Sequence, residues 1–390
     1  MDIKTPETEI RQRLSRLKER LSEAGIEGAL LNQAVDVFYY SGTRQNSVLW
    51  VPVSGEPVLL VKKSISQAHK ESVLKDIQPF PSSRELPSIF SGIKRIGLTH
   101  DVLPMQHFNF YRSILPEHEF MDISAINREL RSVKSPWELD QMRMSGHMLA
   151  EAFGKIPEYL KAGMREIDLA AEFEYRLRRL GIGGYLRIRG FNQEITGIAV
   201  SGRNGASSGC FDGPITGTGQ WTAAPYGPST EPIKENEPVV VDYGGFYNGY
   251  IVDMTRMFCI GRLDPIFENA FRVAADIQSW LIEHLIPGAI CEDLFYGSLK
   301  IAADAGLAEN FMGHPGELAK FVGHGVGLEL DELPVLAPKF SSPLLPGQTI
   351  AIEPKFLFPG KGATGIENTY AITGQRPEKL TELSDGIVYL

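Results

Sequence analysis

The feature of this 390-residue sequence that most constrains its fold is a candidate β-hairpin at residues 239–258, VVVDYGGFYNGYIVDMTRMF. Two arms rich in β-branched residues flank Asn248-Gly249, and an Asn-Gly pair between such arms is the strongest short-range hairpin signal. If this pair forms a two-residue loop, Asp242 and Asp253 lie diagonally across the two strands. Because side chains alternate along a strand, both carboxylates then point to the same face, with Cα atoms roughly 7–8 Å apart.

The two carboxylates of this hairpin need an explanation if their face is buried. Like charges repel each other, and flanking residues such as Val241 and Val252 indicate burial rather than exposure. A bound cation would remove the repulsion. On this spacing alone, however, two acids that point into solvent are the simpler interpretation.

Three later segments each carry a polar residue within a glycine-rich or apolar stretch. His324 lies among glycines in FVGHGVGLEL, Glu353 interrupts the apolar segment TIAIEPKF, and Glu367 follows an isoleucine in GIENTYAIT. Glycines let the backbone come close to a site, and an unpaired glutamate is almost never fully buried. Each residue alone is better explained by a surface position or by a core histidine with its own partners. Taken together with the hairpin, the set predicts a metal site.

The order of these residues resembles the pita-bread metallohydrolases, which include Xaa-Pro aminopeptidase, prolidase and methionine aminopeptidase. The matching features are two aspartates eleven residues apart, a Gly-His-Gly context, a Glu-Pro pair and an Ile-Glu pair. The resemblance covers residues 132–390 and implies an α+β pita-bread catalytic domain, a curved antiparallel sheet backed by helices with the site in its concave face. Residues 1–131 resemble the creatinase-like N-terminal domain, which is α/β. The implied ligands of two divalent ions are Asp242, Asp253, His324, Glu353 and Glu367.

The sequence pattern supports this division into two domains. At 390 residues the chain exceeds the size at which a single hydrophobic core stops growing. Apolar residues recur at helical spacing between Ile10 and Leu21, and short apolar runs typical of strands follow. Near the boundary, Ser135 followed by proline predicts the start of a helix. Further helices are expected at about 167–180, 265–286 and 291–305.

The resemblance also implies how the metal site works. Four carboxylates and one imidazole suit Mn²⁺, Fe²⁺ or Co²⁺ and tolerate Zn²⁺, and Mn²⁺ is the first ion expected. Two ions roughly 3.5–4 Å apart would share a water, lower its pKa and polarise the scissile carbonyl. By the resemblance, Asp253 and Glu367 bridge the ions and Asp242 binds one of them. His324 and Glu353 complete the other, and Glu353 is also the implied catalytic residue that moves the proton.

Three positions depart from the pattern of the family's peptidases. A substrate histidine downstream of a Ser-Gly-x-Asn segment corresponds to Gly209, and a second histidine corresponds to Asp331. An arginine often found two residues before the last glutamate ligand corresponds to Gly365. A proton donor near the leaving nitrogen contributes typically about 10²–10⁴-fold, so a peptidase would need a substitute for these histidines. His314 is the best-placed spare histidine, although a surface role is its simpler interpretation.

The leading prediction is therefore a metal-dependent hydrolase that cleaves a short peptide or a peptide-like amide. One rival is a non-peptidase hydrolase or lyase of a small amide or onium metabolite, for which Asp331 would provide a counter-charge. The other rival is a non-catalytic binding module that uses the same pocket. Gly209, Asp331 and His314 are the candidate substrate-contact positions.

Composition narrows the partners and the compartment. The net charge is −9 and no run of Lys or Arg is long enough to form a phosphate-tracking patch, which argues against nucleic acid as the main partner. No segment approaches the roughly 20 apolar residues that span a bilayer, and the polar N-terminus lacks a signal-peptide pattern, so no membrane partner is expected. Cys210, Cys259 and Cys291 are scattered and odd in number, which favours a reducing cytoplasm. A homodimer is implied by the resemblance alone.

Overall fold

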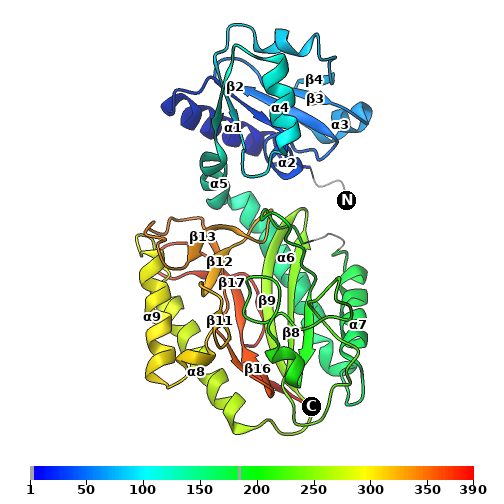
Figure 1. The fold of residues 1–390 in the computed structure, drawn as a ribbon, viewed down its shortest axis with the longest axis vertical. Coiled ribbons are helices and arrows are strands. Elements are labelled where there is room, and N and C mark those ends of the chain that lie inside the picture. Colours follow the sequence, from blue (N-terminus) through cyan, green and yellow to red (C-terminus); the bar gives the residue numbers. More distant parts are fainter. Residues whose placement is uncertain (1–3, 183–185) are drawn as a thin grey trace. The chain divides into compact units, whose positions relative to one another are not determined.

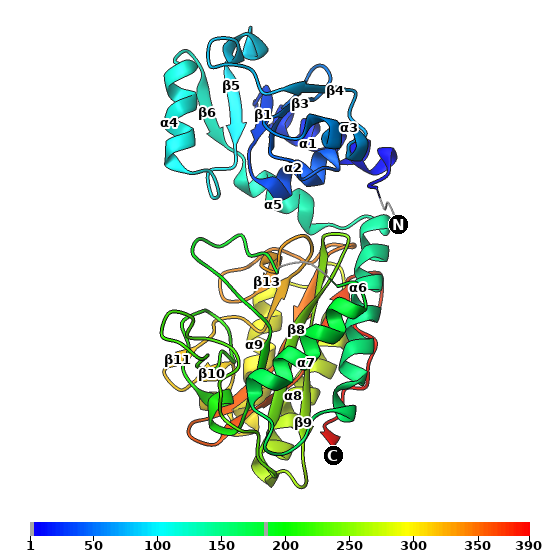
Figure 2. The same cartoon turned by 90° about the vertical axis from the view of Figure 1, so that its right-hand side faces the viewer.

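The structure is a computed structural model that describes residues 4–182 and 186–390. The chain divides into two compact units, Met1–Arg131 and Ser132–Leu390. Figures 1 and 2 show the ribbon in two views at right angles. Within the described residues, no helix combines the length and the apolar character needed to cross a membrane.

The first unit contains one mixed sheet accompanied by helices, which confirms its α/β class (Figure 1). The apolar face predicted for its first helix is buried, from Ile10 to Leu21. The spatial order of the strands is β4 (Asp76–Pro79), β3 (Val58–Val61), β2 (Ser47–Pro52), β1 (Gly28–Leu31), β5 (Arg95–Leu98) and β6 (Glu119–Asp122). The helices are α1 (Glu7–Glu23), α2 (Ala34–Ser41), α3 (Ile65–Glu71), α4 (Met105–Ile114), α5 (Ser124–Ser132) and the 3-10 helix η1 (Leu86–Phe90).

The second unit begins with a helix that its own sequence caps. Ser135 Oγ accepts a hydrogen bond from the Glu138 backbone N–H at 3.1 Å, and the Glu138 carboxylate accepts one from the Ser135 N–H at 3.0 Å. This capping box confirms the predicted helix start. The helices are α6 (Pro136–Gly154), α7 (Glu166–Arg179), α8 (Pro265–His284) and α9 (Cys291–Asp304), with the 3-10 helices η2 (Ile156–Glu158), η3 (Gly202–Ala206) and η4 (Ala308–Asn310).

A nine-stranded sheet forms the centre of the second unit. Its main path runs β13 (Glu332–Leu336), β12 (Gly323–Gly325), β14 (Thr349–Ile352), β17 (Glu367–Ala371), β9 (Tyr250–Cys259), β8 (Val239–Tyr247) and β7 (Ile198–Ser201). Along this path every pair is antiparallel; β18 (Glu378–Lys379) adds to β17, and β19 (Val388–Tyr389) adds to β9 in parallel. Two separate hairpins are β10 (Gly313–His314) with β11 (Glu317–Leu318), and β15 (Lys355–Phe358) with β16 (Gly362–Gly365).

The hairpin of β8 and β9 has the predicted register. Gly244 lies opposite Asp253, and Asp242 lies opposite Thr255. Both loop residues have positive φ, 47° at Asn248 and 94° in the following glycine, as a tight hairpin loop with the twist of the flanking strands requires. The two aspartates therefore share one face of the sheet.

Apolar faces of two helices hold the strands of this sheet in place. In Figure 1, α8 and α9 lie together on one side of the view, and α6 and α7 lie on the other. Ile277 of α8 and Leu294 of α9 belong to the same buried cluster as Ile350 and Ile352 of β14. Hairpin β10–β11 lies on the opposite side of this unit from α6 (Figure 2). Helices packed on an antiparallel sheet confirm the predicted α+β class.

Candidate metal centre

Neighbouring strands of the nine-stranded sheet carry the five predicted metal ligands. In spatial order, β12, β14, β17, β9 and β8 lie side by side. His324 is on β12, Glu367 on β17, Asp253 on β9 and Asp242 on β8, while Glu353 directly follows β14. The sheet thus gathers residues that are far apart in the sequence, because its strand order does not follow chain order.

Three of these side chains form a compact donor set. Each of the residues Asp253, His324 and Glu367 offers one ligand atom, and these three atoms lie within 4.8 Å of one another. Nε2 of His324 is 3.5 Å from Oε1 of Glu353 and 3.8 Å from Oε1 of Glu367. Two or three carboxylates and one imidazole around a single point suit a divalent transition metal.

The imidazole of His324 is oriented from its other nitrogen. Nδ1 of His324 lies 2.8 Å from the carbonyl oxygen of Leu330. A carbonyl can only accept, so Nδ1 carries the proton of this hydrogen bond. In the neutral ring, the lone pair on Nε2 then faces the carboxylates. Histidines that bind metals are usually held in this way, with the second ring nitrogen donating to a carbonyl or carboxylate.

One oxygen of Glu367 lacks a hydrogen-bond partner among the described residues. Glu367 is 1% exposed, and its Oε1 atom is buried without a partner. Its other oxygen, Oε2, accepts from the Thr255 hydroxyl at 2.9 Å. A buried, unsatisfied carboxylate oxygen is unfavourable, and a cation beside Oε1 would satisfy it. The donor set therefore fits a divalent ion held by Asp253, His324 and Glu367, with Glu353 beside them.

A lysine stands on the other side of the same cluster. Nζ of Lys355 lies 2.8 Å from Oδ2 of Asp242, 2.8 Å from Oε2 of Glu353 and 2.9 Å from Oε2 of Glu367. The residue is only 1% exposed. An ammonium group has three N–H donors, and here each has a carboxylate partner. Asp242 therefore already faces a cation that belongs to the chain.

Sequence reasoning missed Lys355, although a signal was present. It lies two residues after Glu353, and alternate residues of an extended segment share a face. The surrounding segment is apolar, and lysine is almost never fully buried unless it is paired. A lysine in a buried strand beside a predicted ligand therefore indicates a partner for that ligand.

The pKa values of the cluster follow from burial and from the excess of negative charge. Burial by itself lowers the pKa of Lys355, but the charges of Asp242, Glu353 and Glu367 raise it well above its ordinary value. Burial, and then the charge of Asp242, raise the pKa of Asp253 to about 7. Burial also raises the pKa of Glu367 well above the usual range. Four acids against one ammonium leave a site that favours a further cation.

His324 and Glu353 are shifted in the directions expected for a close acid–base pair. Burial opposes the charged imidazole, yet the hydrogen bond and charge of Glu353 raise the pKa of His324 to about 10. Burial raises the pKa of Glu353, but the charge of Lys355 and the hydrogen bond from His324 together lower it below its ordinary value. A cation in the donor set would replace the proton on the imidazole, because a ligating histidine is neutral.

The candidate substrate positions Asp331 and Gly209 have defined local surroundings. The Asp331 carboxylate accepts hydrogen bonds from the backbone N–H of Arg189 at 2.7 Å and of Gly190 at 3.0 Å. A Cβ atom at Gly209 would lie 1.8 Å from Oγ1 of Thr216, so this backbone position admits no side chain. The substrate roles of Asp331 and Gly209 stay predictions.

His314 and a second acid lie in segments beyond the sheet. His314 is half-buried in hairpin β10–β11, with Nδ1 3.2 Å from the carbonyl of Pro315, and its role as a proton donor stays a prediction. Asp212 was not singled out from the sequence. Burial, and then the charge of Glu353, raise the pKa of Asp212, so this loop carboxyl lies within the electrostatic field of the site. An isolated aspartate in a loop gives no sequence signal for such a position.

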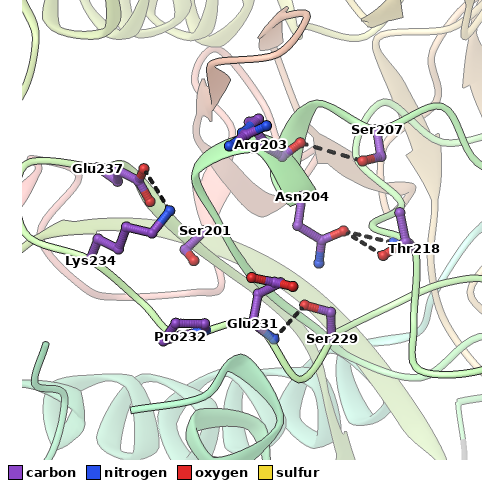
Figure 3. A pocket seen from close by; sticks show the side chains of 10 residues that line it. All are labelled: Ser201, Arg203, Asn204, Ser207, Thr218, Ser229, Glu231, Pro232, Lys234 and Glu237. Atoms are coloured by element: carbon purple, nitrogen blue, oxygen red, sulfur yellow. Dashed lines mark hydrogen bonds and ion pairs between the residues drawn. The ribbon is translucent and has the colours of Figure 1, made fainter. Parts of the chain in front are cut away.

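The Ser-Gly-x-Asn segment lines a separate polar pocket of about 320 Å³ (Figure 3). Oδ1 of Asn204 accepts from the N–H and the hydroxyl of Thr218, both at 2.9 Å. Nδ2 of Asn204 donates to the buried carboxylate of Glu166 at 2.6 Å, and the same carboxylate accepts from Ser201 and Ser229. These bonds fix the backbone at the start of the loop that carries Gly209.

Both units of the chain are similar to known proteins. The profile of metallopeptidase family M24 matches residues 140–374, and that of the creatinase/prolidase N-terminal domain matches residues 13–133. The Xaa-Pro dipeptidase of Pyrococcus furiosus is 25% identical over 375 residues, covering 96% of this chain and 98% of that protein. An uncharacterized peptidase of Bacillus subtilis, YqhT, is 24% identical over 385 residues, covering 97% and 100%.

Solved structures show the same fold over the whole chain. The Xaa-Pro dipeptidase of Bacillus anthracis superposes with a TM-score of 0.84 at 23% identity, covering 98% of this chain and 100% of that one. Dipeptidase PepE of Mycobacterium ulcerans gives a TM-score of 0.82 at 22% identity, covering 99% of both chains. The predicted creatinase-like N-terminal domain and pita-bread fold are thereby confirmed. This chain belongs to metallopeptidase family M24 and carries a creatinase/prolidase N-terminal domain.

Proposed function

We propose that this protein is a metal-dependent hydrolase that cleaves short peptides or peptide-like amides. The observation that carries the proposal is the donor set of Asp253, His324 and Glu367, with an oriented imidazole and an unsatisfied glutamate oxygen. The names of the relatives, Xaa-Pro dipeptidase among them, support a dipeptide with proline after the scissile bond as the first substrate to test.

The side chains of the site would have three different roles in hydrolysis: holding the ion, moving a proton and fixing a carboxylate in place. Asp253, His324, Glu353 and Glu367 would hold the ion, which would polarise the scissile carbonyl and make a water more acidic. Glu353 is our candidate for moving the proton to the leaving nitrogen, because its Oε1 is directed to the donor set. The Lys355 ammonium holds the other oxygen of Glu353 and fixes the carboxylate in place. Mn²⁺ is the preferred ion, and a cytoplasmic homodimer stays part of the proposal.

Activity on Xaa-Pro dipeptides and tripeptides tests the proposal. Protein freed of metal with a chelator and then reconstituted with Mn²⁺ should hydrolyse them, and the Glu353→Ala variant should lose activity by at least about 10²-fold. Glu378→Gln is the matched control, since this acid lies on β18 and pairs with Arg143 away from the site. Equal background rates in wild type and Glu353→Ala would refute the proposal.

The non-peptidase rival is favoured by one specific feature, the position Gly209, where no side chain fits. A histidine at this position would require the loop to move away from Thr216. The counter-charge suggested for Asp331 is less available, because its carboxylate accepts from two backbone N–H groups. A screen of small amides and onium compounds decides between the substrates: turnover of peptides alone would end this rival.

A further inference from the structure

The buried cluster has a side that faces Lys355 and a side that faces His324, and two of its carboxylates have one oxygen on each side. Oε2 of Glu353 and Oε2 of Glu367 accept from the Lys355 ammonium, whereas Oε1 of each faces Nε2 of His324. Asp242 lies on the lysine side, and Asp253 belongs to the donor set on the histidine side. Glu353 and Glu367 thus bridge two cation positions, and one of these is filled by Lys355.

We propose that the Lys355 ammonium permanently takes the place of one of the two cations expected from the sequence, so that this protein binds a single divalent ion on the side of Asp253 and His324. This inference rests on the proposed function and deepens it. Under this inference Asp242 is the partner of a lysine and not a metal ligand.

The hydrogen-bonding capacity of the lysine supports a fixed position. Three N–H donors meet three carboxylate oxygens at 2.8–2.9 Å, so the group has no unused donor and reaches no solvent. A metal ion on the lysine side would need oxygens of Asp242 and Glu367 that the ammonium already occupies. The ion and the ammonium would then be in direct contact, and like charges in a buried site repel strongly.

The neighbouring strand provides room for the lysine. Lys355 pairs with Gly365 across hairpin β15–β16. A Cβ atom at position 365 would lie 2.6 Å from Cγ of Lys355 and 2.6 Å from the carbonyl oxygen of Pro354. A larger residue at 365 would therefore displace the lysine stem. The absence of a side chain at Gly365 thus leaves the space that the Lys355 stem occupies.

The charge balance of the cluster is compatible with one ion beside the lysine. One ammonium and one divalent ion offset three of the four carboxylate charges, and the Thr255 hydroxyl further stabilises Glu367. A second divalent ion would leave the buried cluster with a net positive charge. The charge count therefore permits a single ion beside Lys355, and a second ion is disfavoured because it would lie in direct contact with the ammonium.

The number of bound ions tests the inference directly. Wild type, Lys355→Ala and the control Lys134→Ala are dialysed against excess Mn²⁺, and bound manganese per chain is measured by mass spectrometry of the metal. Lys134 is the control because its ammonium is also buried and bonded to a carboxylate, Glu332 at 2.9 Å, which does not belong to the donor set. We expect one equivalent in wild type, two in Lys355→Ala and one in Lys134→Ala.

The outcomes separate the inference from the proposed function. Two equivalents in wild type would overturn the inference, as would a Lys355→Ala variant that gains no ion over wild type. No ion in wild type would overturn the proposed function together with the inference, whereas two equivalents in wild type would overturn the inference alone. If Lys355→Ala does not fold, the electron paramagnetic resonance spectrum of Mn²⁺ in wild type decides. Isolated Mn²⁺ supports the inference, and an exchange-coupled pair overturns it.

Discussion

Replacing Lys355 by methionine removes a buried positive charge but keeps a side chain of similar length. In the metal-free protein this leaves Asp242, Glu353 and Glu367 without their common hydrogen-bond donor. Removal of one partner from a buried ion pair destabilises a protein by about 3–5 kcal/mol. The loss stays in this range despite three partners, because carboxyl groups with raised pKa values, such as Glu367, take up protons instead.

The expected fall in melting temperature follows from that energy. For a folded unit of this size, 1 kcal/mol corresponds to roughly 2–4 °C, so Lys355→Met should melt about 6–20 °C below wild type. Saturating Mn²⁺ should narrow this difference in melting temperature. An ion whose free concentration is 100 times its dissociation constant stabilises the folded protein by about 2.7 kcal/mol. The variant has the larger deficit of positive charge and should therefore gain more from the ion than wild type does.

Thermal unfolding followed by circular dichroism measures both effects, with and without Mn²⁺, after treatment with a chelator. Lys134→Met is the control, since it breaks the buried bond to Glu332 but lies outside the donor set. Its melting temperature should fall as well, and Mn²⁺ should leave that deficit unchanged. The reasoning fails if Lys355→Met melts within about 2 °C of wild type, or if Mn²⁺ acts equally on both variants.

Three further predictions concern residues outside the cluster. Glu166→Ala should lower the free energy of unfolding by about 2–4 kcal/mol in urea titrations, because the buried carboxylate accepts from the segment that begins the Gly209 loop. A thiol reagent at pH 8 should label Cys210 first, since it is exposed, whereas burial raises the pKa of Cys291 to about 11; mass spectrometry of the adducts checks this. The hydrogen bond from Arg143 lowers the pKa of Glu378 in the folded state, so the pair stabilises the protein above the unfolded pKa of about 4.3. The stability difference between wild type and Glu378→Gln, under about 1 kcal/mol at pH 7, should therefore vanish as the pH falls through the folded pKa.

The hairpin was predictable because its signals are local. The Asn-Gly loop fixes which residues face each other, and a side-chain period of two then fixes the face of Asp242 and Asp253. The helix start at Ser135 was predictable for the same reason, since its capping partner lies three residues later. Such features depend on a few neighbouring residues and on elementary backbone geometry.

The remainder of the site depends on contacts between distant segments. The order of β12, β14, β17, β9 and β8 places His324 near Asp253, and no spacing within the sequence specifies that order. The partners of Asp331, the backbone N–H groups of Arg189 and Gly190, belong to a loop that has no pattern of its own. The ligand set was inferred from the resemblance to a family. A resemblance of this kind could not predict the position of Lys355.

Because of Lys355, part of the negative charge of the buried cluster is neutralised without a metal ion. An ion can dissociate, whereas an ammonium attached to the chain is present as soon as β15 and β16 pair. The lysine side of the cluster, with Asp242, is therefore neutralised on folding and independent of metal supply. The histidine side still combines an unsatisfied Glu367 oxygen with Asp253, whose pKa of about 7 reflects burial and nearby negative charge. Binding of a metal and binding of protons therefore compete at the histidine side alone, and metal affinity should rise with pH because its ligands must lose those protons first.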